Sequence, residues 1–368
     1  MLYHLLFGLA ERHIIFNVFQ YISFRAAAAM VTALLTAFLV GPAVIRILRE
    51  RGWGQIVRTD GPQTHLKKAG TPTMGGLIIL AATLIPTLLW ARLDTAFVWV
   101  AFGVTAWMGA IGFMDDYLKI VRHESRGLIA RYKLAGQFIL GLGLGFFLIF
   151  NPVSSYASNE TMLPFFKDLS IWIWLPIYPL FVACVISGSS NAVNFADGLD
   201  GLATGMSAIA ALSFGLFAYV IGRVDSSSYL GVFYLPGAGE LAVFCAALAG
   251  AAIGFLWFNA PPAEVFMGDT GSLALGGAIG AVAVLLKSEF LLVIVGGVFV
   301  METVSVMLQT SWFKWTRRRT GTGQRLFRMA PIHHHFEKLG WPETKIVIRF
   351  YILAIIFSLV GLATLKVR

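Results

Sequence analysis

The chain has 368 residues, of which 58% are hydrophobic and only 13% are charged, and its mean hydropathy is +0.77. This composition excludes an ordinary soluble domain and indicates that a lipid bilayer is the solvent. The two cysteines, Cys184 and Cys245, each lie inside an apolar run, so they are expected to form neither a disulfide framework nor a thiolate metal site.

Residues 1–22 lack the pattern of a cleavable signal, because Glu11, Arg12 and His13 interrupt the first apolar stretch. We expect an interfacial segment on the periplasmic side. Ten apolar runs follow, each close to the roughly 20 residues that a membrane-spanning helix needs. They lie near residues 24–45, 74–91, 96–114, 134–150, 169–187, 202–222, 240–258, 271–286, 290–311 and 346–365. The sequence thus predicts an all-α membrane protein of ten transmembrane helices, with a single domain over residues 1–368.

Basic residues are concentrated in the loops after the first, third and ninth predicted spans, which hold 20 of the 28 Lys and Arg residues. The positive-inside rule places these loops in the cytoplasm, and the even number of spans then makes both termini periplasmic. Most of these charges are expected only to orient the protein and to contact anionic head groups. Two further loops on this side, 188–201 and 259–270, contain no Lys or Arg, so we expect them to have another role.

Several aspartates at the ends of different spans are predicted to meet at the cytoplasmic face. One acidic pair at a helix end is more often an interfacial solvation device, but five acids in three places favour a metal site. Mg²⁺ prefers oxygen ligands and commonly bridges one or two carboxylates to substrate phosphates. The five are Asp115, Asp116, Asp197, Asp200 and Asp269.

Basic residues lie close to the first acidic pair in the chain. We expect Asp116 and its neighbours to face Lys119, Arg122 and Lys133. Such a mixture of charges is typical of a site that holds a metal together with a polyphosphate.

Two segments rich in acids and amides are candidates for binding a polar ligand. Segment 191–202 contains two Asn and two Asp among glycines, which is more than the capping of one helix requires. Segment 259–272 ends in a predicted helix start at Asp269. Its Phe266 either stacks on a nucleobase or anchors the chain at the membrane interface, and spacing alone does not distinguish these roles.

Three consecutive histidines, His333, His334 and His335, stand in the most basic loop. Neighbours on a helix do not share a face, so this run does not favour a zinc site, and we expect a loop that contacts phosphate. Glu302 and Gln309 are seven residues apart on the ninth predicted span. They share a helix face and are either functional or partners in a helix–helix hydrogen bond.

Residues 68–76 read Lys-Ala-Gly-Thr-Pro-Thr-Met-Gly-Gly and predict a tight entry into the second span. Lys68 is a candidate contact for phosphate. Thr73 is a candidate helix cap.

Together these motifs resemble the polyprenyl-phosphate N-acetylhexosamine-1-phosphate transferase superfamily, and within it the muramoyl-pentapeptide branch. The resemblance covers roughly residues 20–368 and is carried by segments 70–76, 115–119, 191–202, 264–272 and 330–337. It implies transfer of phospho-N-acetylmuramoyl-pentapeptide from UDP-N-acetylmuramoyl-pentapeptide to undecaprenyl phosphate, with release of UMP. It also implies Mg²⁺ as cofactor, a homodimer, and a place in the bacterial inner membrane.

The resemblance also assigns roles to individual residues. The expected metal ligand is Asp269. The expected catalytic residues are Asp115, Asp116, Asp269, His333, His334 and His335. The expected nucleotide pocket consists of Lys68, Gly198, Leu199, Asp200, Asn259, Phe266, Met267 and Gln309. Polar positions of the same cleft are Thr73, Asn194 and Asp197, and basic positions near the phosphates are Lys119 and Lys133, with Arg131 as the alternative to Lys133.

Three rival interpretations remain. The nearest is an enzyme that moves N-acetylglucosamine-1-phosphate onto the same lipid. A cation-coupled transporter is less favoured, because transporter sites usually lie near the bilayer midplane and these acids gather at one face. A purely structural membrane protein does not account for acidic loops without basic residues.

Overall fold

A computed structural model describes residues 1–11, 13–54, 70–122, 127–153, 156–166 and 169–366. The described part of the chain is predominantly helical, and eight of its helices are long and apolar enough to cross a membrane. They are α2 (Ile22–Glu50), α4 (Ala96–Ile120), α5 (Ala130–Phe150), α6 (Tyr178–Ala196), α7 (Leu202–Ile221), α9 (Glu240–Asn259), α10 (Gly268–Leu285) and α14 (Glu343–Ala363). These helices are hydrophobic on most of their faces, as expected for elements that contact either lipid or other helices.

Three further apolar helices complete the bundle. Helix α3 (Gly76–Trp90) has 15 residues, and α11 (Glu289–Val295) continues into α12 (Gly297–Thr320) through a bend of 85°. The remaining elements are short: α1 (Leu2–Leu6), η1 (Phe7–Leu9), η2 (Ile14–Gln20), α8 (Val224–Leu230), α13 (Ile332–Lys338), and the antiparallel strands β1 (Glu160–Met162) and β2 (Ser170–Trp172). The all-α prediction is therefore correct except for this small two-stranded sheet.

Two predicted spans differ from the structure. The run at 169–187 is not one helix, because Ser170–Trp172 pairs with Glu160–Met162 and α6 begins only at Tyr178. Pro179 in the first turn of α6 explains this start, since proline has no N–H to donate and its backbone angle suits the first helical turn. The run at 290–311 is broken at Gly296, where glycine adds backbone freedom.

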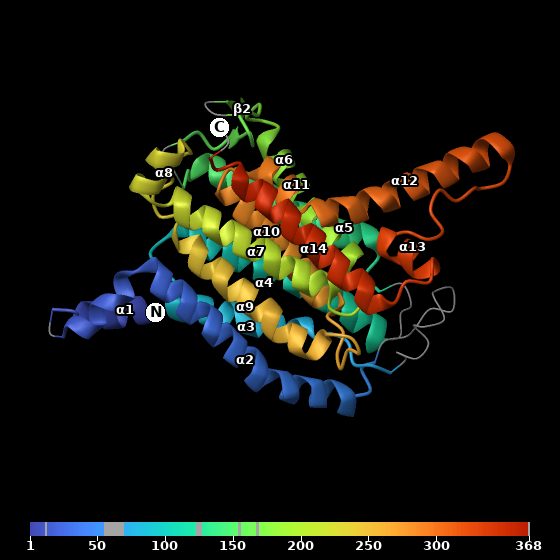
Figure 1. Cartoon of the computed structure of the whole chain (residues 1–368), viewed down its shortest axis with the longest axis horizontal. Helices are drawn as coiled ribbons and strands as arrows, with labels where there is room; N and C mark the ends of the chain where they lie inside the picture. Colours follow the sequence, from blue (N-terminus) through green and yellow to red (C-terminus); the bar gives the residue numbers. More distant parts are fainter. Residues whose placement is uncertain (12, 55–69, 123–126, 154–155, 167–168, 367–368) are drawn as a thin grey trace.

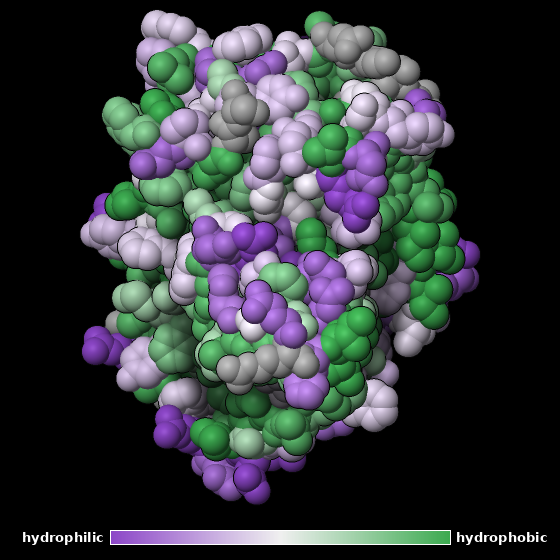
Figure 2. All heavy atoms as spheres, turned by 90° about the vertical axis from the view of Figure 1, so that its left-hand side faces the viewer, coloured by the Kyte–Doolittle hydropathy of each residue, from purple (hydrophilic) through white to green (hydrophobic). Residues whose placement is uncertain are grey.

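Helix α10 lies at the centre of the bundle and is almost completely enclosed, with α4, α6, α3 and α7 packed around it. In Figure 1 both termini lie in the left-hand part of the molecule, whereas α13 lies at the right and α12 extends beyond the bundle as an arm. Figure 2 faces the end that carries α1 and α8, where hydrophilic side chains gather. The start of the central helix α10 is at the opposite end, close to α13.

A buried ion pair joins α2 to α9 near the N-terminal end of the chain. The Arg25 guanidinium donates to both carboxylate oxygens of Glu240, at 2.5 and 2.7 Å, and each side chain is less than 5% exposed. The backbone N–H of Arg92 donates to the same carboxylate at 3.0 Å. The pair therefore fixes two helices and the turn after α3 at one point.

We expect Arg25→Met to lower the thermal unfolding temperature of the purified protein strongly. Removing one partner of a buried pair leaves an uncompensated charge, which costs about 3–5 kcal/mol. The matched control is Arg223→Met, which breaks the exposed pair with Asp225. Unfolding followed in detergent by intrinsic fluorescence should show a clear loss for the first variant and little change for the second. Equal shifts for both variants would contradict the structural role of the Arg25 pair.

Candidate active site

The aspartate pair lies inside α4, in its last two turns, rather than in a loop after the helix. The Asp115 carboxylate accepts a hydrogen bond from Lys119 Nζ at 2.6 Å and another from the backbone N–H of Leu128 at 2.7 Å. Lys119 follows Asp115 by four residues, so the two side chains lie on the same face of the helix. The Asp115 side chain is only 3% exposed, and this carboxylate is therefore held firmly in place.

Asp269 stands in the first turn of α10 and collects donors from three other helices. Its Oδ2 accepts hydrogen bonds from Lys119 Nζ at 2.9 Å and from Lys133 Nζ at 2.8 Å, and its Oδ1 accepts one from Asn194 Nδ2 at 2.7 Å. Lys133 also approaches Asp115 Oδ2, at 3.6 Å. Residues from α4, α5, α6 and α10 thus converge, and the site combines two carboxylates with two ammonium groups.

Asp116 has different partners from Asp115. Its two oxygens accept hydrogen bonds from the backbone N–H groups of Asp269 and Thr270, at 3.1 and 2.9 Å, and from the Thr270 hydroxyl at 2.7 Å. A carboxylate at this place satisfies free amides of the first helical turn and interacts favourably with the helix dipole. Asp116 therefore positions the start of α10, and through it Asp269.

The contacts of the basic residues differ from those predicted for Asp116. Lys119 and Lys133 contact Asp115 and Asp269, whereas the described partners of Asp116 all belong to α10. Arg122 is exposed. Arg131, the alternative to Lys133, stacks on Tyr132 instead of reaching the aspartates.

Close backbone packing around α10 also positions Asp269. A Cβ atom at Gly112 of α4 would lie 2.1 Å from the carbonyl oxygen of Asp269, and one at Gly76 of α3 would lie 2.0 Å from the backbone N of Gly271. Only glycine permits such approaches. Gly112 was not among the predicted site residues, although it lies three residues after Gly109 on the same helix face, a spacing that could have indicated a close contact there.

Segments 70–76 and 264–272, which both carry the resemblance, lie side by side. The backbone N–H of Phe266 donates to the Pro72 carbonyl, and those of Gly75 and Gly76 donate to the carbonyls of Phe266 and Met267, each at 2.8 Å. Met267 is buried and Phe266 is partly exposed. The loop before Asp269 is therefore anchored to the entry of α3.

Asp200 and Asn259 hold the neighbouring loops together. Asp200 Oδ2 accepts a hydrogen bond from the backbone N–H of Ala263 at 3.1 Å, and Asn259 Oδ1 accepts from the backbone N–H of Gly201 and from the Thr204 hydroxyl, both at 3.0 Å. Both side chains are buried. In this arrangement their polar atoms fix the loop after α6 against the loop after α9.

The predicted loop 188–201 begins later than expected, because α6 continues to Ala196 and carries Asn191 and Asn194. Asn191 donates to Gln137 of α5 at 2.7 Å. Asp197 follows the helix. Burial, together with the negative charges of Asp269 and other nearby acids, raises the pKa of Asp197 well above its ordinary range.

The three histidines lie on the short helix α13 and not in the expected loop. As neighbours on a helix they do not share a face, and they have three different partners. His333 is buried beside Glu302, with Nδ1 at 3.1 Å from the carboxylate. His334 Nδ1 lies 3.0 Å from Glu337, and His335 Nδ1 accepts a hydrogen bond from the backbone N–H of Arg328. His333 Nε2 faces Gly198, where a Cβ atom would lie only 2.2 Å from it. The histidine helix α13 thus packs against the loop of Asp197.

The other predicted site residues fall into three groups. Leu199 and Thr73 are buried. Thr73 does not cap α3 as predicted, because the N-cap of this helix is Gly75 and no side chain caps it. Gln309 accepts hydrogen bonds from the backbone N–H groups of Leu326 and Phe327, so it and Glu302 both face the segment after α12, as their spacing predicts. Lys68 lies outside the described residues.

The donor set fits Mg²⁺. No group of three or more acidic, histidine or cysteine ligands is found among the described residues, but Mg²⁺ commonly uses one or two carboxylates and completes its shell with water and substrate phosphates. Asp115 Oδ2 and Asp269 Oδ2 both contact Lys119 Nζ, so the two carboxylates already converge on one cationic group. These two residues would hold the ion.

The fold and the site define a multi-pass membrane protein with a polar site of paired charges at one end of its bundle, suited to phosphorylated substrates. Residues 98–287 match the model of glycosyl transferase family 4, and residues 68–80 match signature 1 of the phospho-N-acetylmuramoyl-pentapeptide-transferases. Proteins of that name from Gemmatimonas aurantiaca and Desulfatibacillum aliphaticivorans are 57% and 53% identical to the chain, over the full length of each. The chain therefore belongs to the phospho-N-acetylmuramoyl-pentapeptide-transferase family, which confirms the resemblance.

Proposed function

We propose that this chain transfers phospho-N-acetylmuramoyl-pentapeptide from its UDP conjugate to undecaprenyl phosphate, giving lipid I for peptidoglycan synthesis and UMP. Family membership supports the choice of substrates. The observation that carries the chemistry is the convergence of Asp115, Lys119, Lys133 and Asp269 from three helices. Phosphoryl transfer needs mainly positioning and charge neutralisation, and this cluster offers both.

We also propose a bacterial inner-membrane protein with ten spans, both termini periplasmic, that acts as a homodimer. Eight single helices, the bent pair α11–α12 taken as one span, and the shorter α3 would together give ten. The basic loops favour a cytoplasmic position for the site. The common position of both termini in the left-hand part of Figure 1 supports an even number of spans.

In the proposed reaction an oxygen of the lipid phosphate attacks the β-phosphorus of the UDP-sugar, and the bond to the departing UMP breaks. Mg²⁺ held by Asp115 and Asp269 would supply charge neutralisation to the pyrophosphate. Lys119 and Lys133 bind phosphate oxygens once these replace the carboxylate contacts. Asp116 keeps Asp269 in place, and Phe266 stacks on uracil.

Two routes are compatible with this arrangement. Asp115 either accepts a proton from the lipid phosphate and orients it, or one aspartate attacks first and carries the phospho-sugar covalently. A phosphomonoester has a second pKa near 6, so strong base assistance is optional in the first route. The test is the exchange of labelled UMP into the UDP-sugar by the Asp115→Asn variant. If this variant exchanged UMP at the wild-type rate, Asp115 would take no part in the chemical step of either route.

The proposal predicts UMP release that depends on both the sugar and the metal. Purified protein in nanodiscs with undecaprenyl phosphate should release UMP from UDP-N-acetylmuramoyl-pentapeptide, and chelation of divalent ions should lower the rate at least about 100-fold until Mg²⁺ is restored, since the ion neutralises transition-state charge. Equal or faster release of UMP from UDP-N-acetylglucosamine would instead indicate the alternative enzyme, which moves N-acetylglucosamine-1-phosphate onto the same lipid. Release unaffected by chelation would overturn the metal role.

A further inference from the structure

A hollow lined by both charged and apolar side chains lies between the end of α2, the end of α9 and the loop after α9. Its volume is about 510 Å³, which is within the range of small-molecule sites, about 300–1,000 Å³. The lining residues come from α2, from the end of α9 and from the loop after it. They are Pro42, Ile45, Arg46, Arg49, Glu50, Phe258 and Glu264.

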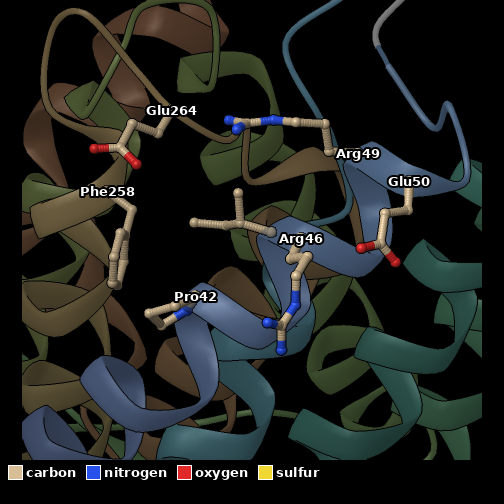
Figure 3. A pocket seen from close by; sticks show the side chains of 7 residues that line it. Pro42, Arg46, Arg49, Glu50, Phe258 and Glu264 are labelled. Atoms are coloured by element: carbon tan, nitrogen blue, oxygen red, sulfur yellow. The ribbon is translucent and has the colours of Figure 1, made fainter.

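The charges around this hollow are balanced but not paired with one another. Figure 3 shows Arg49 extending across the opening toward the side that carries Glu264. Within the described part of the chain, no side-chain hydrogen bond or ion pair is found for Arg46, Arg49 or Glu264. Two guanidinium groups and the carboxylates of Glu50 and Glu264 give the lining no net charge. A ligand that carries a phosphate and an ammonium would match it.

An apolar stripe leads from the hollow along α2. Leu35, Leu39, Pro42, Arg46 and Arg49 are spaced by three or four residues, so they lie on one face of the helix. Leu35 and Leu39 are 54% and 79% exposed, as expected for side chains that contact lipid.

Neighbouring aromatic residues widen this stripe. Phe38 packs against Trp257 of α9 with 5.6 Å between ring centroids, and Trp257 is 73% exposed. The surface is therefore apolar beside the bundle and becomes charged only at the hollow. This change from an apolar to a charged surface matches a lipid, whose acyl chains end in a polar head group.

We propose that this hollow binds a zwitterionic phospholipid with a primary ammonium, of the phosphatidylethanolamine type. Arg49 binds its phosphate, Arg46 adds a second positive charge at the edge of the hollow, and Glu264 accepts hydrogen bonds from the ammonium. The acyl chains lie along Pro42, Leu39 and the aromatic pair. Phosphatidylglycerol offers no cation to Glu264. Phosphatidylcholine offers a quaternary ammonium that has no N–H to donate.

The position of the site couples it to the loop before Asp269. Glu264 donates its backbone N–H to the Phe258 carbonyl at 2.8 Å, and two residues later Phe266 is anchored to Pro72. A head group bound to Glu264 therefore stabilises the position of the segment that carries Phe266 and Met267. Binding of the lipid itself does not rest on the proposed transferase function, and its test needs no activity.

The experiment measures lipid binding to the detergent-solubilised full-length protein, by native mass spectrometry and by thermal unfolding with added lipid. We expect phosphatidylethanolamine to be retained and to stabilise the protein more than phosphatidylglycerol or phosphatidylcholine does. An exposed charge pair contributes up to about 1 kcal/mol, or about fivefold in affinity. Arg46→Gln with Arg49→Gln should therefore weaken phosphatidylethanolamine binding roughly tenfold, and Glu264→Gln should remove the preference over phosphatidylglycerol.

The matched control is Arg318→Gln, an exposed arginine on α12 outside the hollow, which should bind lipid like the unaltered protein. Equal stabilisation by all three lipids, or a double variant that binds like the control, would overturn the proposal. Soluble phosphoethanolamine that protects as well as the lipid would overturn the lipid proposal, because the head group alone would then account for binding. A change of oligomeric state in the double variant, with lipid binding intact, would identify the hollow as a contact between copies.

Discussion

Asp269→Asn should lower the rate of UMP release by about 10³-fold or more. The Asp269 carboxylate accepts hydrogen bonds from Lys119, Lys133 and Asn194, and the amide of the variant cannot balance two ammonium groups. Removing a single preorganised electrostatic group from an active site commonly costs about 10²–10³-fold. Loss of the proposed metal ligand adds to this, so we expect the larger value.

The assay for this variant follows UMP release in nanodiscs at saturating UDP-sugar, with thermal unfolding measured in parallel. Asp225→Asn is the matched control, because Asp225 is an exposed carboxylate on α8 with one arginine partner. It should retain the full rate. If Asp269→Asn kept more than a tenth of the activity while folding normally, the cluster would not be the reactive centre.

The convergence of Asp115 and Asp269 could be predicted, because it follows from the number of apolar runs and from the side of the membrane on which each run ends. Ten apolar runs and the positive-inside rule place the end of the third span and the start of the eighth on the same side. Glycine followed by Asp and Thr indicates a helix start, and α10 begins at Gly268. Distant segments that share a membrane face are thus brought together by topology alone.

The separate roles of Asp115 and Asp116 could not be predicted in this way. Adjacent residues on a helix point about 100° apart, so one of the pair faces the lysines and the other does not. Which of them does so depends on where α10 packs against α4, and hydropathy contains no information about that rotation. The run at 169–187 shows the same limit, since its composition does not indicate that Ser170–Trp172 pairs with Glu160–Met162.

Gly112→Ala should reduce activity although it removes no polar group. The added Cβ would lie 2.1 Å from the Asp269 carbonyl oxygen, which is backbone and cannot rotate away, so α4 and the start of α10 must separate. A displacement of about 1 Å at a catalytic group can cost about 10²-fold in rate. Overpacking of this kind also costs roughly 1–3 kcal/mol of stability.

Gly103→Ala is the matched control, because Gly103 lies on the same helix and a Cβ atom there meets nothing within 4 Å. It should keep the full rate of UMP release and the unaltered unfolding temperature. If Gly112→Ala behaved in the same way, the tight contact between α4 and α10 would not set the position of Asp269. If it lost activity while lipid binding at the α2 hollow stayed normal, the damage would be confined to the start of α10, as the packing of the central helix requires.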